Sequence, residues 1–162
     1  MAAWNRRRLL KPGAHACEFR LARLDGGEIT LGEMTANGPA LLAFFKVTCP
    51  VCQLTLPFLE RIYSHGSIPI YGISQNDAAG TREFNREFGV TFPVLLDTEE
   101  SAFPVSDAFG ISSVPTMFLV EIDGTVSRVM EGWRKTEIEW LGDQAGVRPL
   151  RPSDHVPEWK AG

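Results

Sequence analysis

Apolar and polar residues alternate near the start of the chain and then give way to apolar runs. Alternation over residues 19–24, a predicted turn at 25–27 and the segment 28–31 together predict a small β-hairpin. Residues 40–45 form a continuous apolar run and residues 68–73 a largely apolar one, which is typical of strands buried on both faces. These runs predict the centre of a sheet that is covered on each side.

The segments between the predicted strands have apolar residues at helical spacing. Val51, Leu54, Phe58 and Ile62 recur on one face of a helix predicted over residues 50–65. Further helices are predicted at 78–88, 105–109 and 135–145, and further strands at 94–96, 117–120 and 125–130. Strand–helix–strand units require parallel pairing, whereas the late hairpin requires antiparallel pairing. The sequence thus predicts an α/β fold with a central mixed β-sheet flanked by helices.

The two ends of the chain differ from this alternating middle. Residues 1–14 form a leader with a basic cluster, and residues 146–162 contain three prolines without a sustained period. We expect both ends to be extended or partly ordered. The expected organisation is therefore a leader (1–14), a single domain (15–145) and a C-terminal tail (146–162).

Composition and charge exclude several classes of function. The chain is 44% hydrophobic and 22% charged with a net charge of −4, which gives no electrostatic reason to bind nucleic acid or an anionic membrane. No stretch reaches the roughly 18–20 apolar residues of a membrane span. The first residues also lack the apolar core of a secretory signal. We therefore expect a cytoplasmic protein, unless a leader has been removed.

The cysteines carry the strongest chemical signal. Cys49-Pro50-Val51-Cys52 lies where a buried strand leads into a helix. Free N–H groups and the positive end of the helix dipole favour an anionic sulfur there, and Cys-x-x-Cys sites of this kind reach pKa values of about 3.5–7.5. Cys49, at the exposed corner, is the predicted nucleophile, and Cys52, one turn further and more buried, would resolve the mixed disulfide.

Metal binding is the alternative use of such a pair. A structural zinc site needs four ligands, but there is no second cysteine pair, and His15, His65 and His155 are isolated in the sequence. Haem attachment needs a histidine after the second cysteine, where Gln53 stands. A chaperone that binds Cu(I) through two thiolates stays open as a less favoured hypothesis. We expect no metal ligand and no cofactor.

Two further positions belong to the predicted site or its surroundings. Val114-Pro115 directly precedes a predicted strand, where a cis proline would present backbone groups to an extended substrate. Val114 and Pro115 are therefore predicted substrate-binding residues. Cys17, near the first hairpin, is predicted to be a structural thiol.

Together, these motifs and the segments around them resemble a known family. It is similar to the thioredoxin superfamily, in the branch of TlpA-like and ResA-like thiol–disulfide oxidoreductases, which grade into the AhpC/TSA-related redoxins and peroxiredoxins. The resemblance covers roughly residues 12–145. The matching segments are Pro12-Gly13, residues 16–19, Phe44-Phe45, the Cys49–Cys52 motif, Pro57, residues 89–97, 109–111 and 114–116, Asp123-Gly124 and Gly132.

This resemblance implies a thioredoxin-like fold in which a cis Pro115 packs against the cysteine pair. It also implies that residues 75–92 form an inserted strand–helix segment. The chain departs from the family pattern at the usual proton acceptors, because Ala43 and Thr55 stand where relatives carry a buried Asp or Glu. Lys46 and Glu60 are near in sequence, and we expect both to be charges at the surface of the helix.

The leading hypothesis is a thiol–disulfide oxidoreductase that acts on protein or small-molecule disulfides and is recycled by another thiol system. The second hypothesis is a peroxiredoxin-like thiol peroxidase with an antioxidant role. With Cys52 as the attacking residue, Phe45 and Cys49 stand where the peroxiredoxin motif has proline and threonine. Both motif residues are missing, so the peroxidase is the weaker alternative.

Overall fold

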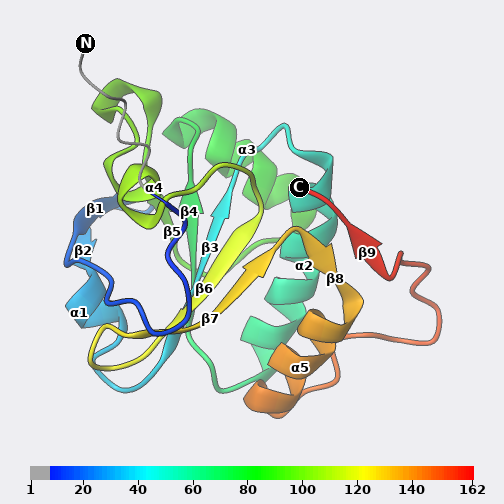
Figure 1. The fold of residues 1–162 in the computed structure, drawn as a ribbon. Helices are drawn as coiled ribbons and strands as arrows, with labels where there is room; N and C mark the ends of the chain where they lie inside the picture. Colours follow the sequence, from blue (N-terminus) through cyan, green and yellow to red (C-terminus); the bar gives the residue numbers. More distant parts are fainter. Residues whose placement is uncertain (1–7) are drawn as a thin grey trace.

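The computed structural model describes residues 8–162; part of the predicted leader, including Arg6 and Arg7, lies outside the described residues. The strands are β1 (Arg20–Arg23), β2 (Glu28–Thr30), β3 (Ala40–Phe45), β4 (Ile70–Ser74), β5 (Val94–Leu96), β6 (Thr116–Val120), β7 (Val126–Glu131), β8 (Trp133–Arg134) and β9 (Trp159–Lys160). The helices are α1 (Leu31–Met34), α2 (Pro50–His65), α3 (Ala78–Phe88), the 3-10 turn η1 (Glu99–Ser101), α4 (Pro104–Phe109) and α5 (Lys135–Ala145) (Figure 1).

Seven strands form one mixed sheet in the order β2-β1-β5-β4-β3-β6-β7. The strands β3, β4 and β5 are parallel, while β1 and β6 run antiparallel to their neighbours. The predicted α/β architecture with an N-terminal β-hairpin is therefore confirmed. The strand–helix insertion expected at residues 75–92 contains the helix α3. The strand that follows this helix, β5, begins only after residue 92.

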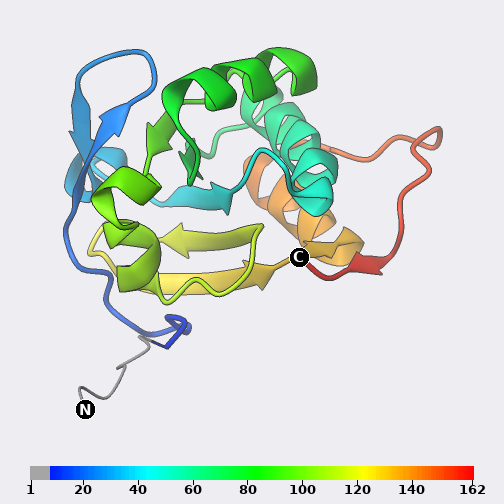
Figure 2. The same cartoon turned by 90° about the horizontal axis from the view of Figure 1, so that it is seen from above.

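Both faces of the sheet are covered, which explains the continuous apolar run of β3. Successive strand residues point to opposite faces. Phe44 contacts Phe109 of α4, with ring centroids 5.2 Å apart, and Phe45 contacts Phe84 of α3 at 5.1 Å. All six β3 residues are buried. Helices α2 and α5 lie together, away from α4, as Figures 1 and 2 show.

Among the described residues, no helix is both long enough and apolar enough to cross a bilayer. The longest helix, α2, has sixteen residues and carries polar side chains along its length.

The C-terminal tail is more ordered than its sequence suggests. It leaves α5 at Gly146, is bound to Arg61 of α2 through Asp154, and then forms β9, which pairs antiparallel with β8 in a separate two-stranded sheet. The indole N–H of Trp133 donates to the carbonyl of Pro157 at 2.6 Å. The tail therefore runs back to the edge of the domain at which β7 and β8 meet (Figure 2).

Candidate active site

Cys49 is the residue that caps the N-terminus of α2. Its backbone is extended (φ −82°, ψ 116°), and its sulfur accepts a hydrogen bond from the backbone N–H of Cys52 at 3.2 Å. Pro50 occupies the first turn, where its missing N–H costs nothing because no intrahelical acceptor exists for it. The sequence Cys-Pro thus starts the helix and places a sulfur at its positive end.

The loop before Cys49 is fixed by two side-chain amides that the sequence analysis did not identify. Asn76 accepts a hydrogen bond from the N–H of Val47 at 2.9 Å, and Gln53 donates to the carbonyl of Val47 at 3.0 Å. Both residues lie outside the Cys-x-x-Cys motif, Gln53 on α2 and Asn76 in the loop after β4, and neither position gives a pattern that would reveal such a contact.

The two motif cysteines differ in exposure. Both are free thiols; Cys49 is partly exposed, whereas Cys52 is fully buried. The prediction that Cys52 is the more buried of the pair is confirmed. An external disulfide therefore meets the sulfur of Cys49 first.

Burial raises the pKa of the Cys52 thiol well above its ordinary value. A hydrogen bond with Cys49 raises this pKa further, while a backbone hydrogen bond at Lys46 and the charge of Lys46 oppose both effects. Cys52 thus keeps its proton in the resting dithiol.

Val114 completes the immediate surroundings of the exposed sulfur. The thiol of Cys49 donates to the carbonyl oxygen of Val114 at 3.4 Å, across 65 positions of sequence. The Val114–Pro115 peptide bond is cis, as the family resemblance implies. The structure therefore brings Cys49, Cys52 and the Val114-Pro115 pair together, while the substrate-binding role of the pair stays a prediction.

Cys52 receives no carboxylate from Glu60, and the other charged residue near it in sequence is a lysine, Lys46. The carboxylate of Glu60 accepts hydrogen bonds from the N–H groups of Thr91 at 2.9 Å and of Phe92 at 3.2 Å, so it holds that turn rather than being a free surface charge. Lys46 is exposed, as expected. The buried hydroxyl of Thr55 donates to the carbonyl of Val51 at 2.7 Å.

The third cysteine and the histidines lie elsewhere. Cys17 is exposed, which does not fit the structural role predicted for it. His15 pairs with Thr125 in an isolated bridge, and His65 contacts the carbonyl of Arg61. Within residues 8–162, no group of three or more His, Cys, Asp or Glu side chains is placed to hold a metal ion.

The tail also approaches the site, which the sequence did not predict. The carbonyl of Pro115 accepts a hydrogen bond from Gly132 at 2.8 Å, and Gly132 lies directly before β8, the partner of β9. Gly162 lies against the carbonyl oxygen of Val114 so closely that a Cβ there would collide with it. Pairing between such short strands leaves no periodicity that a sequence could show.

Comparisons with known proteins agree with this geometry. The model of the AhpC/TSA family matches residues 12–129. The thiol-disulfide oxidoreductase ResA of Halalkalibacterium halodurans is 30% identical over 130 residues, covering 78% of this chain and 72% of that protein. The ResA protein of Bacillus subtilis is 29% identical over 127 residues, covering 76% and 69% of the two chains.

A solved structure supports the fold. The solution structure of a thiol:disulfide interchange protein from Bacteroides sp. has a TM-score of 0.71 at 18% identity, covering 85% of this chain and 91% of that one. The matched family model spans the strand β3, the Cys49–Cys52 motif and the Val114-Pro115 loop. The chain therefore belongs to the AhpC/TSA family and, within it, to the ResA-like thiol-disulfide oxidoreductases with a thioredoxin-like fold.

Proposed function

We propose that the chain exchanges dithiol for disulfide with protein substrates through Cys49 as nucleophile and Cys52 as resolving thiol. The observation that carries the proposal is the asymmetry of the pair: a partly exposed Cys49 sulfur caps α2, while Cys52 is buried one turn behind it. Thiolates at helix N-termini are the reactive form in such exchange reactions.

In the direction of substrate reduction, the Cys49 thiolate attacks one sulfur of the substrate disulfide. A mixed disulfide forms, and the other substrate sulfur leaves as a thiolate. Cys52 then loses its proton and attacks the Cys49 sulfur, which releases the second substrate sulfur and leaves a Cys49–Cys52 disulfide. An external dithiol returns two electrons to restore the pair, and oxidation of a substrate dithiol follows the same steps in reverse.

The deprotonation of Cys52 limits the second half of this cycle. Its pKa is raised by burial, and Ala43 and Thr55 provide no carboxylate to accept the proton. Lys46 supplies the opposing positive charge. We propose that water accepts this proton and that a mixed disulfide lives longer here than in relatives with a buried acid.

The peroxidase alternative requires Cys52 as the attacking thiolate. That cysteine is fully buried and its pKa is raised, so the reactive form is disfavoured where a peroxide would need it. The exposed sulfur of Cys49 fits exchange with a disulfide better, and we keep the oxidoreductase as the proposed function.

The test uses three serine variants in an insulin-reduction assay with dithiothreitol as the recycling dithiol. We expect Cys49→Ser to abolish turnover. Incubated with insulin in the absence of dithiothreitol, Cys52→Ser should accumulate a covalent complex with substrate that added reductant cleaves. Cys17→Ser is the matched control, since Cys17 is exposed and outside the motif, and its turnover should equal that of the unaltered protein. Full turnover by Cys49→Ser would overturn the assignment of roles.

A further inference from the structure

The end of the tail is held in place beside the active-site loops. In β9, Trp159 and Lys160 pair with Arg134 and Trp133 of β8, and the carbonyl of Glu158 accepts a hydrogen bond from Lys135 at 3.0 Å. A Cβ on Gly132 would lie 2.6 Å from the carbonyl oxygen of Lys160. The tail therefore packs directly on the backbone of Gly132, without side chains between them.

Beyond β9 the tail reaches the Val114 carbonyl. Gly162 lies against this oxygen, which also accepts the hydrogen bond from the Cys49 thiol at 3.4 Å. A single carbonyl group therefore separates the tail from the reactive sulfur. Val114 is only 8% exposed, so little of its surface is left for another chain. In Figures 1 and 2 the C-terminus lies beside the start of α2.

The backbone of Gly132 and Val114 forms an edge that suits a polypeptide in an extended conformation. Peptides recognised by strand addition lie along exposed backbone groups in an extended conformation, which gives affinity without a fixed side-chain sequence. Trp159 and Lys160 already lie extended in β9 beside Gly132, and Gly162 lies against Val114. Resting on the function proposed above, we propose that residues 159–162 occupy the binding place of an extended polypeptide substrate and compete with it for the edge formed by Gly132 and Val114.

The competing segment is weakly attached compared with the rest of the tail. Both residues of β9 are exposed, Trp159 with 56% of its surface, and a two-residue strand pair adds little stability by itself. The preceding residues hold more firmly, through the Trp133–Pro157 hydrogen bond and the Asp154–Arg61 ion pair. A polypeptide can thus displace residues 159–162 while the root of the tail stays bound.

This arrangement sets a preference among substrates. A small disulfide needs only the partly exposed Cys49 sulfur, which the tail leaves accessible. A polypeptide needs the backbone edge as well, so its exchange with Cys49 is slowed until the tail moves. The tail is therefore a specificity-determining segment for the exchange reaction.

The test measures single exchange at Cys49 with two thiopyridyl disulfides, one on an extended peptide and one on cysteamine. All proteins carry Cys17→Ser, because the exposed Cys17 thiol would also react with the probes. In each reaction the Cys49 thiolate attacks the sulfur of the probe, a new S–S bond forms as the old one breaks, and pyridine-2-thione leaves with the electron pair. Its absorbance gives the rate constant. No turnover is needed, so a failure of insulin reduction would count against the proposed function alone.

Two variants displace the tail by different means. Lys160→Pro removes an N–H and disrupts pairing with Trp133, and Gly162→Val places a side chain where the Val114 carbonyl lies. Lys160→Ala is the matched control, because it keeps the backbone pairing. Melting temperatures confirm that each variant is folded.

We expect the peptide rate constant to rise about tenfold in both displacing variants, the equivalent of one lost backbone hydrogen bond in the competing tail. The rate constant with the cysteamine probe should stay within about twofold of its value in the unaltered protein. Lys160→Ala should have the same rate constants as the unaltered protein with both probes. An unchanged peptide-to-cysteamine ratio in both folded variants would overturn the proposal. A fall in the peptide rate would also overturn it, since the tail would then assist binding.

Discussion

The buried thiol of Cys52 makes the stability of the folded protein depend on pH. In the unfolded chain a cysteine releases its proton at about pH 8.5, whereas burial raises the pKa of Cys52 in the folded protein. Below about pH 8.5 both states hold the proton and the group has no effect on the pH dependence of stability. Above it only the folded state binds the proton, so deprotonation favours the unfolded chain.

We therefore predict that the free energy of unfolding of the reduced protein falls above about pH 8.5, by up to about 1.4 kcal/mol per pH unit. Urea unfolding between neutral and alkaline pH, in the presence of a phosphine reductant, measures this slope. Cys52→Ala should remove the Cys52 part of the slope, whatever its constant effect on stability. Parallel curves for the two proteins would contradict the prediction.

Asp97 connects the end of one strand to the start of a helix. It follows β5 and is fully buried, and its carboxylate accepts hydrogen bonds from the N–H groups of Val105 at 3.1 Å and Ser106 at 2.6 Å. Helix α4 has no cap from its own N-cap residue, Phe103. The cap of this six-residue helix is therefore supplied from outside, by a residue before it in sequence.

Asp97→Ala leaves two N–H groups without an acceptor and should lower the free energy of unfolding by about 2–4 kcal/mol. Asp97→Asn keeps one acceptor oxygen and should lose less. The control is Asp25→Ala, whose carboxylate is 71% exposed in a turn and pairs with Arg23. Its effect should stay below about 0.5 kcal/mol. Equal urea midpoints for Asp97→Ala and the control would refute the capping role.

Glu60, on α2, fixes the turn between α3 and β5. Its carboxylate accepts hydrogen bonds from the N–H groups of Thr91 and Phe92, and from the Thr91 hydroxyl. Glu60→Ala should cost about 1–2 kcal/mol and speed amide exchange at Thr91 and Phe92. Glu87→Ala, an exposed position on α3, is the control and should leave both amides as they are. Unchanged exchange in Glu60→Ala would show that the turn holds without it.

The sequence predicts elements well where a run is long enough to show a period. The bounds of β3, β5, α2, α3 and α5 agree with the structure, because burial imposes their apolar pattern. It misses α1, η1, β8 and β9, which have two to four residues each and therefore no period. Cys49 and Cys52 are found from their spacing and from their position between a buried strand and a helix. The contact of Gly162 with Val114 depends on the whole path of the tail, and no local pattern records it.

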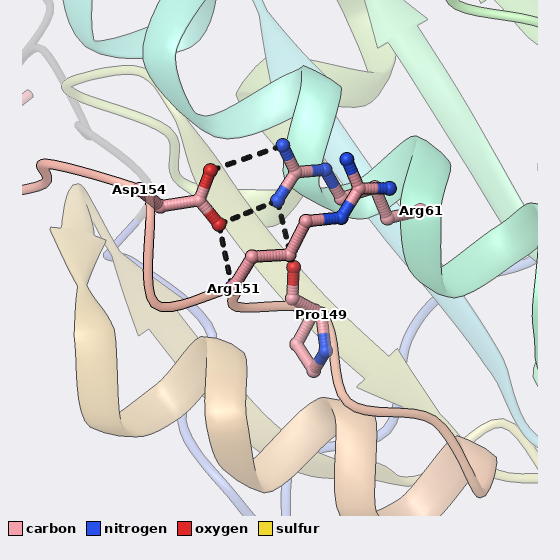
Figure 3. A network of polar contacts seen from close by, with 4 residues as sticks. All are labelled: Arg61, Pro149, Arg151 and Asp154. Atoms are coloured by element: carbon pink, nitrogen blue, oxygen red, sulfur yellow. Dashed lines mark hydrogen bonds and ion pairs between the residues drawn. The ribbon is translucent and has the colours of Figure 1, made fainter.

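At the scale of the whole molecule, α2 links the reactive sulfur to the root of the tail. Its first turn holds the cysteine motif, and Arg61, three turns later, holds Asp154 with N–O distances of 2.7 and 3.1 Å. Figure 3 shows the same guanidinium donating to the carbonyl of Pro149, and the N–H of Arg151 donating to Asp154. One arginine therefore closes the turn at 149–154 and fastens it to the active-site helix.

The hydrogen bond from Arg61 and the backbone N–H of Arg151 hold the pKa of Asp154 below its ordinary value. The carboxylate is therefore charged at neutral pH, and the anchor is present above about pH 3.9, the pKa of an unfolded Asp. As the pH falls through the lower folded pKa, the carboxylate is protonated and the ion pair is lost. We predict that tail residues lose amide protection on acidification before the central strands do.

Asp154→Asn removes the charge at every pH, so the tail should already show low amide protection factors at neutral pH, with no further pH-dependent loss. Because residues 159–162 follow this anchor, the variant should also raise the peptide exchange rate at Cys49 in the direction of Lys160→Pro. Asp143→Asn, an exposed carboxylate on α5, is the control and should change neither readout. If Asp154→Asn keeps the protection of the unaltered protein, the tail is held by the Trp133–Pro157 contact and the β8–β9 pair instead.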